Sequence, residues 1–103
     1  MQTYPKKRIE IIAEAPLESR LIELIDRLQV QGYTVLPAIG GRGHEGNWSR
    51  EGLVGTAGQM IVLVCIVDPA RAEEVVEAVY RLLENRIGIV SVSDVEVIRG
   101  DHF

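Results

Sequence analysis

The sequence has little of several features that would define a protein class at once. It holds a single cysteine, Cys65, so no disulfide can form within the chain, and a small buried hydrophobic residue is the ordinary interpretation. No apolar run approaches the ~20 residues that a membrane-spanning helix needs. A net charge of −4 and a pI near 5.1 lack the basic excess of a nucleic-acid-binding surface. Without a signal-peptide segment at the N-terminus, a cytoplasmic location is the default expectation.

What the chain does contain is a globular composition. Hydrophobic residues make up 47% and charged residues 25% of its 103 residues, which is typical of a folded chain. This length predicts a single domain over residues 1–103. So short a chain has a limited core, so association with further copies would add stability.

Hydrophobic periodicity predicts six elements. The helices begin at Pro16 and Pro69, the second ends at Asn85 or Gly88, and strands are expected at 8–13, 33–39, 60–67 and 89–99. This order predicts an α+β, ferredoxin-like βαββαβ sandwich with a long loop between strands two and three.

Individual residues add local expectations. Gly32 is expected to take a left-handed conformation after the first helix, and Asp68 to cap the second. Pro37 predicts an edge strand, because proline cannot donate to a ladder. A phase change in the last strand predicts a bulge near Ser93–Asp94. The basic run Lys6–Arg8 is interpreted as a solvated edge.

The strand at 60–67 is apolar at all of its positions, which is typical of a central strand buried on both faces. Two helices can cover only one face of a four-stranded sheet. We therefore expect another copy to cover the second face, giving a homo-oligomer with clefts between subunits.

The most unusual stretch is the glycine-rich segment before this strand. It contains seven of the chain's ten glycines, at positions 40, 41, 43, 46, 52, 55 and 58. Consecutive backbone N–H groups left bare by glycine can form a concave anion site, and the Arg42 guanidinium can bind the same oxygens bidentately. The pattern predicts a mobile, anion- or nucleotide-binding loop at about residues 40–58. A plain flexible hairpin loop is the alternative.

Other motifs in this region carry weaker signals. The dinucleotide-binding spacing is present at Gly41, Gly43 and Gly46, but no helical pattern follows it as that fingerprint requires. Trp48 is equally a partner anchor or a residue folded back on the loop.

Metal and nucleophile sites are disfavoured. No zinc-ligand spacing supports a metal site formed by His44, Glu45, Asp101 and His102, so exposed loop or tail positions are preferred. No histidine is placed to activate Ser49, Ser91 or Ser93.

Several segments together resemble the PII signal-transduction superfamily, over nearly the whole chain. They are Gly32–Val35, the loop from Gly40, the helix start Asp68–Pro69 and the strand Val92–Arg99. Most similar is the PII-like branch associated with carboxysomes and inorganic-carbon uptake. The resemblance implies a homotrimer that binds adenine nucleotides in three intersubunit clefts, and a T-loop whose order changes with ligand.

The resemblance also implies ligand-binding residues. Those for the nucleotide are Thr34, Gly40, Gly41, Arg42, Gly43, Ile66, Val67, Gly88 and Arg99. Those for bicarbonate are Gly41, Arg42 and Gly43, and those for a protein partner are Trp48 and Arg50.

The chain departs from the family pattern before and after the last strand. A Gly-Asp-Gly-Lys segment is replaced by Asn85-Arg86-Ile87-Gly88, and the tail lacks the paired arginines. Less positive charge remains for a third phosphate, so ADP or AMP is favoured over ATP. The loop has no tyrosine, which excludes control by uridylylation.

Together these features predict a regulatory sensor and not an enzyme. The resemblance implies that ADP or AMP and bicarbonate order the loop, and that the loop contacts a bicarbonate transporter or carboxysome component. No metal, cofactor or catalytic residue is expected. Two alternatives stay open: a small phosphohydrolase with Arg42 as phosphate clamp, and a purely structural trimer.

Overall fold

The elements follow the predicted order, with a small hairpin added. The computed structural model describes residues 1–43, 46–49 and 59–103, and only the backbone at 46–49 and 102. The strands are β1 (Tyr4–Glu14), β2 (Tyr33–Pro37), β3 (Gly40–Gly43), β4 (Gly46–Ser49), β5 (Met60–Val67) and β6 (Gly88–Val97). The helices are α1 (Glu18–Arg27) and α2 (Ala72–Leu83), and three 3-10 turns are η1 (Ala15–Leu17), η2 (Pro69–Arg71) and η3 (Gly100–His102).

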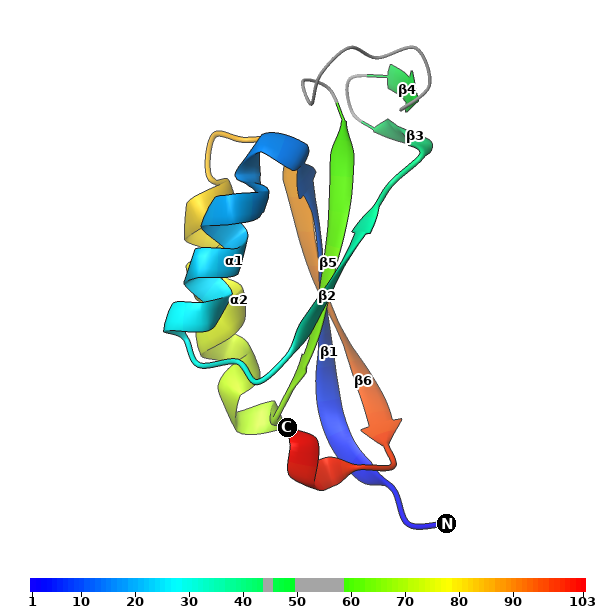
Figure 1. Ribbon diagram of the computed structural model, residues 1–103, viewed down its shortest axis with the longest axis vertical. Coiled ribbons are helices and arrows are strands. Elements are labelled where there is room, and N and C mark those ends of the chain that lie inside the picture. The colour runs from blue at the N-terminus through cyan, green and yellow to red at the C-terminus, as the bar shows by residue number, and fades with distance from the viewer. Residues whose placement is uncertain (44–45, 50–58) are drawn as a thin grey trace.

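Four strands form one antiparallel sheet in the order β2-β5-β1-β6. Both helices lie on the same side of this sheet (Figure 1). The predicted ferredoxin-like sandwich is therefore confirmed. β2 is an edge strand, as Pro37 indicated, and β5 is a central strand with the predicted bounds.

The core lies between the sheet and the helices. Every second residue of the two central strands is buried there, namely Ile9, Ile11, Ala13, Ile61, Leu63, Cys65 and Val67. The helices cover them with residues spaced three or four apart, namely Leu21 and Ile25 from α1 and Ala72, Val75, Val79 and Leu83 from α2. This spacing is that of one helix face, so the apolar periodicity of the sequence accounts for the core.

The two helices are tied together at their ends. The guanidinium of Arg71, in η2, donates to the backbone oxygens of Leu28 (2.5 Å) and Gln29 (3.4 Å). These carbonyls follow α1, where helical partners run out. Neither helix in the described part of the chain is long and apolar enough to cross a membrane.

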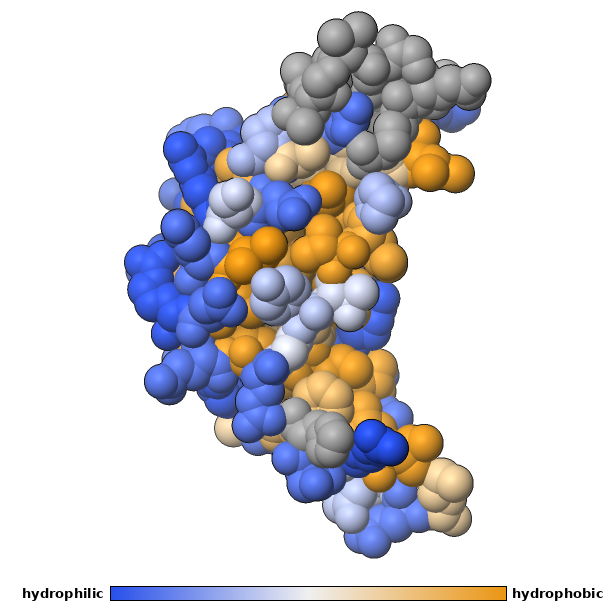
Figure 2. Space-filling view, viewed as in Figure 1, coloured by the Kyte–Doolittle hydropathy of each residue, from blue (hydrophilic) through white to orange (hydrophobic). Residues whose placement is uncertain are grey.

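The opposite face of the sheet, called here the open face, has no helix over it among the described residues. Ile12, Val62, Val64 and Ile66 are only half-buried there. Leu36 is 50% and Ile89 66% exposed. Figure 2 shows hydrophobic residues gathered over the sheet, beside the hydrophilic helices. A single chain therefore leaves this apolar surface uncovered, as the sequence predicted.

Two expectations about helix ends were wrong. Gly32 has no positive φ; the left-handed residue after α1 is Gln29, with φ 60°, because the chain turns immediately after the helix towards β2. Asp68 makes no capping hydrogen bond; its carboxylate instead accepts from the Lys6 ammonium. Asn85, with φ 64°, does end the second helix as expected.

Two expectations about strands were also wrong. Pairing of β1 with β6 is continuous from Tyr4–Val97 to Ala13–Gly88, so there is no bulge at Ser93–Asp94. The phase change records a change in which face carries apolar residues, with the backbone regular throughout. The run Lys6–Arg8 lies in the central strand β1, and the Lys6 side chain is only 10% exposed.

The Cys65 thiol provides a test of this core. Burial raises its pKa from 9.0 to about 11. The unfolded state therefore loses this proton first, so the associated stability is present below about pH 9 and is lost as the pH rises towards 11. We expect the free energy of unfolding to fall more steeply between pH 9 and 10.5 in the wild type than in Cys65→Ala, measured by urea denaturation. A native thiol that reacts with Ellman's reagent at pH 8 as fast as the unfolded chain would contradict this burial.

Candidate functional site

The residues implicated in nucleotide binding lie at two ends of the sheet. Gly88 pairs with Ala13 beside the start of β5, and the Ala38 N–H donates to the Met60 carbonyl (3.1 Å), so Gly40–Gly43 follow at this same end. We call it the loop end. The opposite end of β5 is seven residues away, about 23 Å at strand rise.

The opposite end, called here the tail end, holds the remaining residues. Ile66 and Val67 pair there with Arg8 and Lys7, and Arg99 follows β6. Thr34 pairs with Val64, nearer to this end than to the loop end. The two groups are therefore too far apart in one chain for a single phosphate group to contact both.

In its described part, the loop predicted from Gly40 contains a short β-hairpin. β3 and β4 pair antiparallel, with Arg42 opposite Asn47 and Gly43 opposite Gly46. In an extended strand, successive N–H groups point to opposite sides. The expectation that consecutive amides of Gly40–Gly43 gather into one concave site was therefore wrong. Alternate amides on the outer side of β3, together with the exposed Arg42, are what an anion could reach.

Several candidate residues belong to the loop that follows Gly43. Trp48 lies in β4, where only the backbone is described, while Arg50, His44 and Glu45 lie outside the described residues. The candidate partner-binding surface therefore stays a prediction.

At the tail end, side chains point alternately to the core and to the open face, and this decides which of them a ligand can contact. Val67 is 4% exposed and belongs to the core, so its side chain is not available to a ligand. Ile66 is half-buried on the open face, and the exposed Thr34, opposite Val64, shares that face. Thr34 and Ile66 thus flank one surface.

The charges at the tail end are largely paired. Lys6 pairs with Asp68, Lys7 with Asp94, and Arg8 with Glu10 at 3.4 Å. Arg99 is exposed and its side chain forms no ion pair with any residue in the described part of the chain. Arg99 is therefore the cation at this end whose charge is available to an anion.

Two of the cavities in the described part of the chain lie near the implicated residues. The larger, about 680 Å³, is lined by Tyr80, Leu83, Glu84, Asn85, Gly88 and Val90. The smaller, about 540 Å³, is lined by Ala15, Glu18, Ser19, Val35, Pro37, Gln59 and Ile61. The charged lining residues are Glu84 and Glu18, both negative, so neither cavity suits a phosphate.

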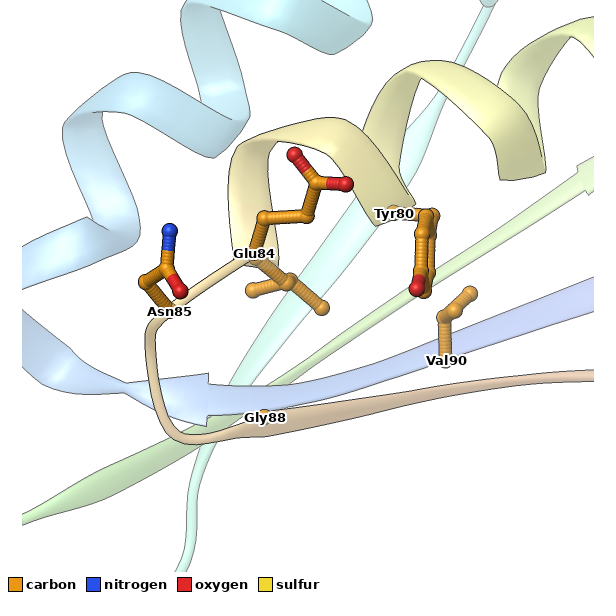
Figure 3. Close-up of a pocket in the computed structure, with 6 residues that line it drawn as sticks. Tyr80, Glu84, Asn85, Gly88 and Val90 are labelled. Atoms are coloured by element: carbon orange, nitrogen blue, oxygen red, sulfur yellow. The ribbon is translucent and has the colours of Figure 1, made fainter.

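The larger cavity includes residues that the sequence analysis did not single out. Tyr80 projects from α2 towards Val90 of β6, whereas the Glu84 side chain, directly after α2, points away from that strand (Figure 3). The two residues are four positions apart in the sequence. That spacing was the available signal, but Tyr80 follows the core residue Val79 and fits an ordinary amphipathic helix.

The described part of the chain gives no support to the remaining candidates for catalysis or metal binding. Ser91 and Ser93 are exposed on β6 and pair with Glu10 and Arg8 in the ladder. Among the residues that the structure describes, no group of three or more His, Cys, Asp or Glu side chains could hold a metal ion.

Fold and site together define a small ferredoxin-like protein with glycine-rich and basic segments at opposite ends of its sheet. The family model described as nitrogen regulatory protein P-II matches residues 6–102. The chain therefore belongs to the P-II family. A search of curated proteins finds no match.

Solved structures place it near the PII-like proteins. CPII from Thiomonas intermedia K12, bound to ADP, AMP and bicarbonate, is 27% identical with a TM-score of 0.89, over 99% of this chain and 96% of that one. CPII bound to ADP and bicarbonate is 29% identical with a TM-score of 0.84, over 99% and 97%. A PII-like signalling protein from Thermus thermophilus is 32% identical with a TM-score of 0.82, over 100% and 99%.

Gly88 has a packing role that can be separated from ligand binding. A Cβ there would lie 3.0 Å from both the Ile12 carbonyl oxygen and Leu83 Cδ2, whereas one at Gly32 would meet nothing within 4 Å. We expect Gly88→Ala to cost about 1–2 kcal/mol of unfolding free energy, measured by urea denaturation without nucleotide. The matched control Gly32→Ala should be neutral or slightly stabilising. Equal stability of the two variants would contradict the packing role.

Proposed function

We propose that the protein is a non-catalytic sensor that binds ADP or AMP together with bicarbonate in clefts between the subunits of a homotrimer. Similarity to CPII over nearly the whole of both chains supports this ligand set, because CPII has been solved with ADP, AMP and bicarbonate.

The observation that carries the proposal is the division of the implicated residues between the loop end and the tail end. Neither of the two cavities described above offers a cation to a phosphate. A cleft that combines the loop end of one subunit with the tail end of its neighbour brings both groups together. The uncovered open face supplies the apolar surface on which subunits can associate.

Each group has a role in that cleft. Thr34 and Ile66 flank the base and ribose, and Arg99 supplies a charge to the phosphates. Arg42, with those backbone amides of the Gly41–Gly43 segment that the β3–β4 ladder does not use, suits a small planar anion such as bicarbonate, because charge-assisted hydrogen bonds to oxygen are strong and directional. Gly40, which has no side chain, leaves room beside the phosphates, whereas the space beside Gly88 is filled by Ile12 and Leu83.

The output of the sensor is a change in the loop that Gly40 begins. A ligand shifts such an equilibrium only if it binds one loop state better than the other. A bicarbonate transporter or a carboxysome component is the partner that the family resemblance suggests, with Trp48 and Arg50 as contact residues.

Calorimetric titration tests the ligands. We expect ADP to bind with measurable heat, and bicarbonate to increase its affinity. Arg42→Ala should weaken ADP binding about tenfold, as loss of a charged hydrogen bond does, and abolish the bicarbonate effect. Arg20→Ala, an exposed arginine on α1, is the matched control.

No heat with ADP in either buffer would refute the proposal. Unchanged binding by Arg42→Ala would favour the structural trimer, and release of phosphate during the titration would favour the phosphohydrolase.

Subunit mixing tests the shared cleft. Arg42→Ala removes a loop-end residue and Arg99→Ala a tail-end residue, so each variant alone should bind ADP weakly. When the two are refolded together in equal amounts, about one cleft in four combines an intact loop end with an intact tail end. Tight ADP binding should therefore return in about one cleft in four of the mixed trimers. A mixture that binds no better than the separate variants would show that both arginines act from the same chain or not at all.

A further inference from the structure

After β6 the chain turns back across the start of β1. The final ladder pair of the sheet joins Val97 to Tyr4, and η3 begins three residues later at Gly100. A Cβ on Gly100 would lie 2.5 Å from Tyr4 Cγ and 2.8 and 2.9 Å from its Cδ2 and Cδ1. No side chain fits in that space, so the backbone of Gly100 lies directly against the tyrosine ring.

This contact has a large part in holding η3. The turn has three residues, lacks a side-chain cap, and is closed by a long hydrogen bond from the Phe103 N–H to the Gly100 carbonyl (3.4 Å). So short a turn is marginal by itself. Its position therefore depends on packing against β1, and the Tyr4 ring supplies such packing.

Arg99 lies between two residues that Tyr4 contacts, Val97 and Gly100. Tyr4 pairs with Val97 on one side of it and packs on Gly100 on the other. The Arg99 backbone (φ −120°, ψ 71°) belongs to neither strand nor helix, so neighbouring contacts determine it. Its side chain forms no ion pair within the described ranges that would orient it.

We propose that Tyr4 and Gly100 are positioning residues that direct the Arg99 guanidinium towards the phosphates of the bound nucleotide, an inference that rests on the proposed function. A guanidinium binds phosphate oxygens through a planar fork, so its direction matters as much as its charge. A side chain at position 100 would be forced against the Tyr4 ring, and the resulting shift of the backbone would turn the Arg99 guanidinium away from the phosphates. The Tyr4 hydroxyl has no part in the contact.

The test is a mutant cycle on the full-length protein, with ADP titrated calorimetrically. Arg99→Ala should weaken ADP binding about tenfold. Gly100→Ala should weaken it at least threefold in the wild type and have no further effect in the Arg99→Ala background. Tyr4→Phe keeps the ring and should bind normally. Tyr4→Ala adds no bulk, so it remains informative if Gly100→Ala does not fold, and should also weaken binding only when Arg99 is present. Gly32→Ala is the glycine control.

The possible failures are distinguishable. If Gly100→Ala and Tyr4→Ala weaken binding equally with and without Arg99, their effect is general destabilisation and the positioning role is wrong. If Arg99→Ala weakens binding but neither of the other variants does, the positioning role is again wrong while the proposed function stands. If Arg99→Ala has no effect although ADP binds, the assigned role of Arg99 falls and the positioning inference with it.

Discussion

The pairing of β1 with both β5 and β6 is the constraint on which the rest of the structure depends. β1 is hydrogen-bonded along both edges, and its register decides which residues face the helices. Because side chains alternate, a slip of one residue would send Ile9 and Ile11 to the open face and Arg8 and Glu10 into the core. The same ladder sets the ends of the sheet, since it brings Asp68 beside Lys6 and Gly88 beside Ala13. The positions of the functional segments thus follow from one strand.

The sequence was sufficient where a residue's own chemistry decides its environment. An unbroken apolar run located β5 with its observed bounds, and Pro37 identified an edge strand. The sequence was insufficient where a partner far away in the chain decides a residue's environment. Lys6 looks like a solvent-exposed residue until Asp68, 62 positions later in the sequence, is seen to accept a hydrogen bond from its ammonium, with the Lys6 side chain only 10% exposed. Gln29 rather than Gly32 is left-handed because the direction of β2 overrides local preference.

The candidate site shows the same division. Resemblance indicated the residue types at the loop end and the tail end, and antiparallel topology already implied that the end of β2 and the end of β5 lie apart. The sequence could not show whether each of these groups is buried, paired or directed towards a ligand. Val67 turned out to be a core residue, and the amides of Gly40–Gly43 alternate in direction. Within the described residues, Arg99 has no ion pair although three neighbouring cations have partners. These are properties of the packed chain, because pairing and burial are decided between segments.

A site shared between chains couples ligand binding to assembly. A nucleotide that needs a loop end and a tail end from different subunits binds only the associated form, so its binding free energy adds to that of association. The open face argues that association is needed in any case, since Ile89 and Leu36 leave apolar surface in water when the chain is alone. Assembly and sensing would then use one surface for two purposes. In the proposed trimer, the apolar centre of the sheet would join the subunits, and the two ends of the sheet, brought opposite each other by that joining, would form the place where an anionic ligand binds.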